Sequence, residues 1–292
     1  MQTEEIARKV RGIELRTKKL VNEVFSGEYH SVFKGKGIEF AEVREYGIGD
    51  DIRLIDWNVT ARTGRPYIKT FEEERELTVM LVVDASGSGH FGSLGMFKGD
   101  LAAEVSAVLA FSAIKNNDRV GLVIFTDHIE LYIPPQKGKK HVLRVIREIL
   151  FFKPEGKKTS IKDALGHVNR IMKRKSIVFL ISDFMDSGFE SAMSVAARKH
   201  DLIAVTIGDQ REESLSDSGL MVFEDAETGE VFIADTSSKI VRQRYGEYMQ
   251  KRQTDLVGLF RRYGVDRIAL RTGQTYENEL VKFFKKRIHQ FR

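Results

Sequence analysis

From residue 78 onward, short apolar runs alternate with longer helical patterns. The runs are TVMLVV, RVGLVIF, SIVFLI, LIAVTI and DRIAL, and the helical patterns lie near residues 94–116, 139–151, 160–173, 187–199 and 237–263, with a further helix at the C-terminus. Runs without polar alternation are typical of parallel strands buried on both faces, and the intervening helices supply the crossovers. The sequence therefore predicts an α/β fold with a mostly parallel sheet and helices on both faces.

The chain before residue 78 has a different pattern. Residues 1–27 carry an apolar stripe at helical spacing and end at a glycine, which predicts an amphipathic helix. Residues 28–77 are punctuated by glycines between the stretches IEFAEV, DIRLI and PYIKTF, which are typical of short strands. We therefore expect an N-terminal helix, a small β-rich subdomain and a main domain over residues 78–292. Within the main domain, MVFEDAETGEVFIAD predicts a hairpin that turns at Thr228 and Gly229.

Composition excludes several classes of function. The chain has no cysteine, so a metal ion would have to be held by oxygen or imidazole. The 47 basic and 42 acidic residues nearly balance, so the charge does not indicate a nucleic-acid partner. No apolar run approaches the ~18 residues of a membrane helix, and the charged N-terminus does not resemble a secretory signal. We expect a cytoplasmic protein without a membrane span.

Polar residues follow three buried segments in the order typical of a ligand site. In open α/β sheets, ligands bind beyond the C-terminal ends of the strands. After TVMLVV comes the turn D-A-S-G-S, in which alternate residues project to one side. Thr159 follows the loop FKPEGKK and precedes a helix, and Asp183 follows SIVFLI. Carboxylate and hydroxyl oxygens suit Mg²⁺, with Mn²⁺ or Ca²⁺ as other hard cations. Such a site with few carboxylates leaves the ion's positive charge partly uncompensated and favours an Asp or Glu supplied by a protein partner.

The motifs DASGS, TSIKDAL and FLISDF resemble the metal-ion-dependent adhesion site of von Willebrand factor A domains. The resemblance implies that five positions bind a divalent metal directly or through water: Asp84, Ser86, Ser88, Thr159 and Asp183. This sequence departs from the family pattern at Gly89, where methionine is common, and at Phe184, where glycine is common. These departures affect the shape of the loops rather than the metal ligands.

Residues 33–76 contain GKGIEFAEVREYGIGDDIRLIDWNVTAR and PYIKTFEEERE, which resemble the signature of a bacterial family known as domain of unknown function 58. Members combine this segment with a von Willebrand factor A-like domain and are commonly encoded beside MoxR-type AAA+ ATPases. The resemblance implies an adaptor or co-chaperone that works with such an ATPase in the maturation of protein complexes, in which the metal site recruits the ATPase or its client.

Three other interpretations use the same residues. The stretch from Gly87 to Gly92 fits G-x-G-x-x-G, but the carboxylate of Asp84 would repel a pyrophosphate. A serine hydrolase needs G-x-S-x-G, which D-A-S-G-S-G does not match. Magnesium-dependent phosphate hydrolysis would use Asp84 and Asp183, without the lysine loop that usually accompanies it.

The turn D-A-S-G-S could also be an ordinary strand-to-helix connection in which Asp and Ser satisfy backbone groups. A metal-free structural interaction protein is therefore the alternative. The three segments that match the adhesion site follow one another in the right order, and this favours the metal-binding interpretation. We expect a non-enzymatic, metal-dependent protein-interaction module.

Overall fold

The structure is a computed structural model that describes residues 11–12, 21, 39–72, 77–93 and 95–290. The helix predicted over residues 1–27 lies almost wholly outside the described residues. The chain divides into two compact units, of which the smaller is residues 33–77. Within the described part of the chain, no helix is both long and apolar enough to cross a membrane.

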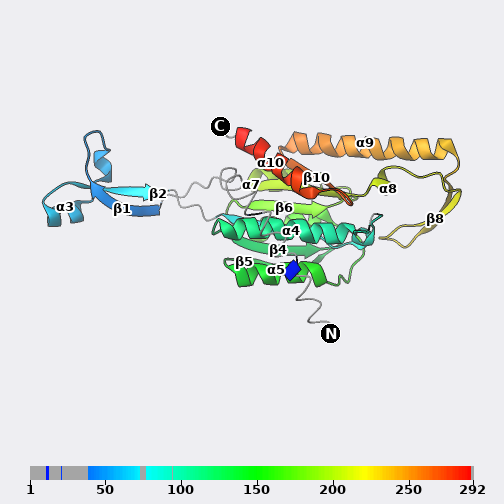
Figure 1. The fold of residues 1–292 in the computed structure, drawn as a ribbon, viewed down its shortest axis with the longest axis horizontal. Helices are drawn as coiled ribbons and strands as arrows, with labels where there is room; N and C mark the ends of the chain where they lie inside the picture. Colours follow the sequence, from blue (N-terminus) through cyan, green and yellow to red (C-terminus); the bar gives the residue numbers. More distant parts are fainter. Residues whose placement is uncertain (1–10, 13–20, 22–38, 73–76, 94, 291–292) are drawn as a thin grey trace. The chain divides into compact units, whose positions relative to one another are not determined.

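The larger unit is built on a six-stranded sheet with the order β10-β7-β6-β3-β4-β5 (Figure 1). The strands are β3 (Thr78–Asp84), β4 (Arg119–Phe125), β5 (Ile129–Gln136), β6 (Ile177–Ser182), β7 (Asp201–Gly208) and β10 (Asp266–Arg271). All neighbours pair in parallel except β4 and β5. Numbered within this sheet, the order is 6-5-4-1-2-3, the doubly wound arrangement. The predicted mostly parallel α/β sheet is confirmed.

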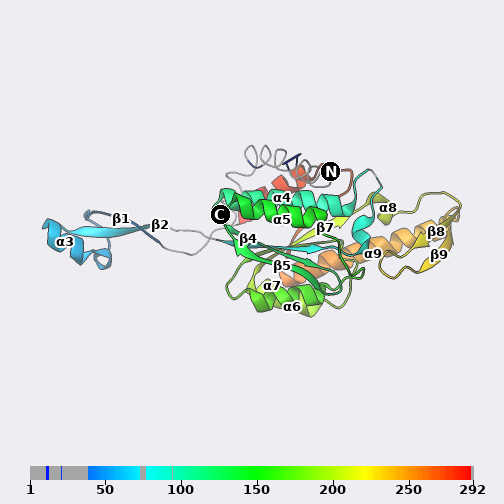
Figure 2. The same cartoon turned by 90° about the horizontal axis from the view of Figure 1, so that it is seen from below.

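Helices cover both faces of this sheet (Figure 2). One face carries α4 (Lys98–Lys115), α5 (Lys139–Phe151) and α10 (Tyr276–Gln290), and the other carries α6 (Ile161–Ile171), α7 (Glu190–Lys199) and α9 (Lys239–Tyr263). The second layer packs its apolar side chains on Met80, Val82 and Phe125 of the central strands. This is the arrangement expected of a von Willebrand factor A-like domain.

The central strand β3 sets the position of the site. Its residues from Val79 to Val83 are buried, because β4 and β6 flank it and helices cover both its faces. Val83 is in register with Ile181 of β6. The polar residues that follow β3 and β6 therefore leave the sheet at the same edge and next to each other.

The edge strand β5 was not among the predicted strands. Its segment IELYIPPQ contains two prolines, and within it only Ile133 is buried, so it lacks the apolar run of a central strand. Proline is tolerated at a sheet edge, where one side of the strand has no ladder to complete. A pattern search for buried parallel strands passes over such a segment.

In the smaller unit, β1 (Glu39–Glu45) pairs antiparallel with β2 (Tyr67–Glu72). The strand expected at DIRLI is wrong: Ile52–Leu54 is a 3-10 helix, and α3 (Trp57–Thr63) follows it. The side chain of Asp51 accepts a hydrogen bond from the backbone of Arg53, and Asp56 caps α3 in the same way. Capping by aspartate provides partners for the free N–H groups of a helical turn and so outweighs the apolar alternation.

The predicted hairpin is present as β8 (Leu220–Glu224) and β9 (Val231–Asp235), an antiparallel pair separate from the main sheet. The turn between these strands contains Thr228, and Gly229 takes a φ of 73°, a left-handed conformation that favours glycine.

Candidate metal centre

The carboxylate of Asp84 is held between the ends of β3 and β6. Its Oδ1 accepts a hydrogen bond from the backbone N–H of Ser86 at 3.0 Å, and its Oδ2 accepts one from the hydroxyl of Ser182 at 2.6 Å. Asp183, next in the chain, lies close enough for its negative charge to act on Asp84. Two of the predicted ligands, from strands far apart in the sequence, are thus brought together.

The two predicted serine ligands lie on one side of the loop that follows β3. The loop forms a short 3-10 helix, Gly87–His90, and the Oγ atoms of Ser86 and Ser88 are 3.2 Å apart. Ser86 is buried, and the hydroxyl of Ser88 acts together with Lys98 to lower the pKa of Asp183. Alternate residues of this turn therefore present their oxygens together toward β6.

Thr159 reaches the same region through the loop before α6. The backbone N–H of Gly87 donates to the carbonyl of Lys157 at 2.8 Å, which joins this loop to the serine turn. The backbone N–H of Ser160 donates to the carbonyl of Thr126, also at 2.8 Å, at the end of β4. The hydroxyl of Thr159 donates to Oε1 of Glu227 at 2.7 Å. The structure therefore connects Thr159 to the serine turn and adds an acidic neighbour.

A lysine that the sequence analysis missed lies beside Asp183. Nζ of Lys98, in the first turn of α4, is 2.7 Å from Oδ2 of Asp183 and 2.6 Å from Oε1 of Glu212. The Lys98 side chain is only 4% exposed. A lysine at the start of a helix is ordinarily solvated, so the sequence contains no signal that this one points inward.

Burial and the neighbouring charges shift the ionisation of these groups. Burial, followed by the negative charge of Asp183, raises the pKa of Asp84 to about 6. Burial also acts to raise the pKa of Asp183, but the charge and hydrogen bond of Lys98 outweigh it, so this pKa lies below its ordinary value. The two aspartates therefore differ because the lysine contacts only one of them.

The donor set fits a hard divalent cation. The site holds three carboxylates, those of Asp84, Asp183 and Glu212, and one ammonium group, that of Lys98. When all three carboxylates are ionised, the site has a net charge of two negative units in a partly buried place. Among the described residues, no group of three His, Asp or Glu side chains could hold a metal. A hollow of about 20 Å³ lined by Asp84, Ser88, Lys98 and Asp183 could hold one water-sized species.

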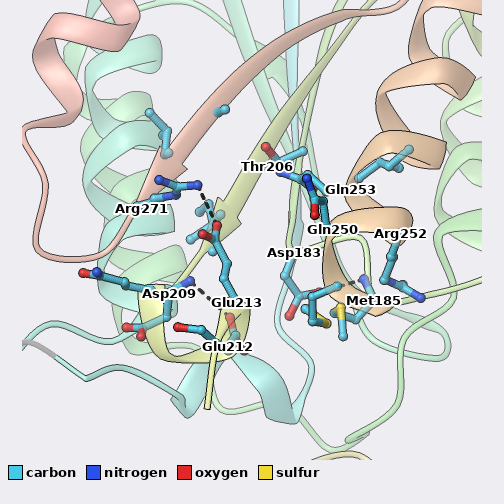
Figure 3. Close-up of a pocket in the computed structure, with 18 of the residues that line it drawn as sticks. Asp183, Met185, Thr206, Asp209, Glu212, Glu213, Gln250, Arg252, Gln253 and Arg271 are labelled. Carbon is cyan, nitrogen blue, oxygen red and sulfur yellow. Dashed lines mark hydrogen bonds and ion pairs between the residues drawn. The ribbon is translucent and has the colours of Figure 1, made fainter. Parts of the chain in front are cut away.

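Asp183 also lines a larger cavity of about 750 Å³. Figure 3 shows this cavity with Asp209, Glu212, Glu213 and Arg271 along one side, and with Gln250, Arg252 and Gln253 of α9 along the other. The short helix α8 (Gln210–Glu213) follows β7 and contributes residues to the lining of this cavity. Polar and charged side chains thus line the cavity beside the nearly buried side chain of Asp183.

The family model described as "Protein of unknown function DUF58" matches residues 42–255. An uncharacterized protein of Mycobacterium tuberculosis is 30% identical over 97% of this chain and 90% of its own length. The chain belongs to the DUF58 family. An uncharacterized protein of Mycobacterium avium is 25% identical to this DUF58 protein over 53% of the chain and 93% of its own length.

Three solved structures resemble the DUF58 chain at lower similarity. BatB from Bacteroides thetaiotaomicron is 14% identical, with 73% of this chain and 99% of that one covered and a TM-score of 0.47. Proximal thread matrix protein 1 from the mussel byssus, described with a zinc-occupied MIDAS motif, is 19% identical, with coverage of 46% and 39% and a TM-score of 0.38. The SpRpn10 VWA domain is 14% identical, with coverage of 46% and 76% and a TM-score of 0.34.

In this DUF58 protein, Phe184 takes the backbone conformation that glycine would favour. Its φ is 57°, which is uncommon for a bulky residue. The side chain is buried and packs edge-on against Phe189 and Phe260, with ring centroids 6.1 and 5.2 Å away. Aromatic packing between α7 and α9 therefore stabilises a strained turn directly after Asp183.

Proposed function

We propose that this DUF58 protein is a non-enzymatic, cytoplasmic, metal-dependent protein-interaction module. The observation that supports it best is the convergence of Asp84, Ser88 and Asp183 around a hollow the size of one water molecule. The buried excess of negative charge there calls for a cation beyond Lys98. The adjoining cavity, which Asp183 also lines, is the side from which a partner would approach.

The residues that would hold the ion are Asp84, Ser86, Ser88, Thr159 and Asp183. Mg²⁺ suits this oxygen set and retains water ligands, while Mn²⁺ and Ca²⁺ are further candidates. The ion would supply a positive charge to which a partner's aspartate or glutamate binds. The chain's own part is to hold these oxygens at the edge of the sheet and to keep bulk water away from Asp84.

The resemblance to families encoded beside MoxR-type AAA+ ATPases suggests the partner. We propose that the module acts as an adaptor or co-chaperone that presents a client to such an ATPase, or recruits the ATPase itself, during maturation of a protein complex. Binding of the ATPase would be measured in Mg²⁺ and in EDTA. The proposal requires that EDTA and Asp84→Ala each abolish the binding.

The metal itself is tested by a Mn²⁺ titration followed by electron paramagnetic resonance. We expect one site in the wild type, and its loss in Asp84→Ala and in Asp183→Ala. Asp255→Ala, an exposed position on α9, is the control for loss of an acidic side chain and should bind as the wild type does. Wild-type binding no tighter than that of the site variants would reject metal dependence.

The Lys98–Asp183 ion pair favours a second candidate, a metal-free interaction protein in which the lysine provides the positive charge. In that case Mg²⁺ would leave the melting temperature of the wild type unchanged, whereas a metal that binds the folded chain raises it. The proposed lack of catalysis is tested separately with p-nitrophenyl phosphate. Turnover that Asp84→Ala abolished would indicate a phosphohydrolase.

A further inference from the structure

Glu227, in the turn between β8 and β9, lies against the predicted metal site. Its Oε1 accepts the hydrogen bond from the hydroxyl of Thr159 at 2.7 Å, across 68 residues of sequence. Glu227 is half-buried, and burial raises its pKa; the hydrogen bond from Thr159 opposes this shift, and the negative charge of Asp183 adds to it. The carboxylate is therefore part of the same electrostatic environment as the predicted ligands, although no motif marks it.

The turn that carries Glu227 is internally fixed. Oδ1 of Asp225 accepts hydrogen bonds from the backbone of Glu227 at 2.9 Å and of Thr228 at 2.8 Å. The backbone N–H of Gly229 donates to the carbonyl of Asp225, and that of Asp225 donates to the carbonyl of Glu230, both at 2.8 Å. The backbone position of Glu227 is thus set by the turn, so only its side-chain torsions have to be ordered when it meets Thr159.

The same turn packs directly on the serine turn. A Cβ atom at Gly87 would lie 2.2 Å from the carbonyl oxygen of Ala226. Only glycine leaves room for this approach, and the backbone N–H of Gly87 is bonded to the loop that carries Thr159. The hairpin turn, the serine turn and the Thr159 loop therefore form one packed unit.

The chemistry of a hydroxyl ligand gives Glu227 a role. A threonine hydroxyl binds a cation through an oxygen lone pair, and its single proton must then point elsewhere. A carboxylate that accepts the proton fixes the rotation of the hydroxyl and makes its oxygen a stronger donor, as outer groups do for other metal ligands. Within the described part of the chain, Glu227 is the acceptor to which Thr159 donates.

We propose that Glu227 is a positioning residue that orients the Thr159 hydroxyl for metal binding through the hydrogen bond between them. The inference rests on the proposed metal-dependent function. It makes the β8–β9 turn a part of the metal centre, and it predicts that displacement of this turn weakens the site without any change in the five predicted ligands.

A double-mutant cycle tests the proposal, with Mn²⁺ as the probe and electron paramagnetic resonance as the readout. Glu227→Ala should weaken Mn²⁺ binding about tenfold, the lower end of the effect of such outer groups. In the Thr159→Val background, the same substitution should have much less effect, because the hydroxyl through which it acts is gone. Glu227→Gln, which keeps an acceptor oxygen, should bind Mn²⁺ more tightly than Glu227→Ala.

Glu230→Ala is the matched control, because it removes an exposed glutamate from the end of the same turn. It should leave Mn²⁺ affinity unchanged. Equal losses from Glu227→Ala in both backgrounds, or unchanged or tighter binding in Glu227→Ala, would overturn the role of Glu227 while the metal site stands. Absence of Mn²⁺ binding by the wild type would overturn the metal-dependent function and this inference with it.

Discussion

Nζ of Lys98 lies 2.7 Å from Oδ2 of Asp183, and both side chains are almost completely buried. The ion pair joins the first turn of α4 to the end of β6, and Glu212 accepts a second hydrogen bond from the same ammonium. A buried pair of this kind is costly to break, because each partner then leaves an uncompensated charge in a poorly solvated place. Lys98 therefore controls both the stability of this edge and the charge that a metal ion would meet.

Lys98→Met removes the ammonium but keeps most of the side-chain volume. In EDTA we expect a loss of about 3–5 kcal/mol in the free energy of unfolding, the cost of leaving a buried carboxylate unpaired. Urea unfolding measures it. Mg²⁺ should restore part of the loss, because an ion bound near Asp183 replaces the missing charge. Lys162→Met, at an exposed position of α6, should stay within about 0.5 kcal/mol of the wild type. Equal stabilities of the two variants would show that the pair contributes nothing.

The pKa of Asp84 predicts a pH dependence of stability. Because its folded value of about 6 lies above its ordinary value of 3.8, the folded chain binds this proton more tightly than the unfolded chain. The contribution of Asp84 to stability therefore falls as the pH rises from about 4 to about 6. Asp84→Asn should remove this fall and raise the stability at pH 7 in EDTA by about 3 kcal/mol. Urea unfolding of both proteins at several pH values checks this prediction. If the stability of the wild type and of Asp84→Asn depended on pH in the same way, the raised pKa of Asp84 would be contradicted.

Gly87→Ala should separate the serine turn from the hairpin turn. The added methyl group would meet the carbonyl of Ala226 at 2.2 Å, so the backbone of one turn has to move, and we expect a loss of about 1–3 kcal/mol. Gly89→Ala, two residues further along the same turn, is the control, because its nearest neighbour lies 4.0 Å away. Thermal unfolding compares the two. A Gly89 variant as unstable as the Gly87 variant would point to the turn's general intolerance of side chains.

Phe184→Ala tests whether aromatic packing stabilises the strained turn after Asp183. The side chain is 1% exposed, and removing a buried phenylalanine costs about 3–5 kcal/mol. Met185→Ala, the next residue, removes a side chain that is 44% exposed and should cost much less. Chemical denaturation measures both variants. If Phe184→Ala unfolded at the same urea concentration as Met185→Ala, the packing would not be what stabilises the turn.

The parallel strands of the main sheet could be predicted because a strand buried on both faces is an apolar run that can be recognised within its own segment. Val79 to Val83 and Ile177 to Ile181 are uninterrupted apolar runs, which few other structures require. The hairpin turn at Thr228 and Gly229 could be predicted for the same reason, since the residues that form it are neighbours in the sequence. At DIRLI the apolar alternation was misleading, since Asp51 caps a helical turn that the pattern of side-chain hydrophobicity does not report.

By itself, the sequence determined the class of the fold, the family, and the segments that end at the site, because each depends on residues near one another in the chain. The tertiary structure alone decided which charges meet there. Lys98 and Asp183 are 85 residues apart, Lys98 and Glu212 are 114 apart, and Thr159 and Glu227 are 68 apart. Each of these side chains would be an ordinary solvated group in its own segment. They become a site because parallel strands in register bring their C-terminal ends to one edge, where burial leaves the charges only one another as partners.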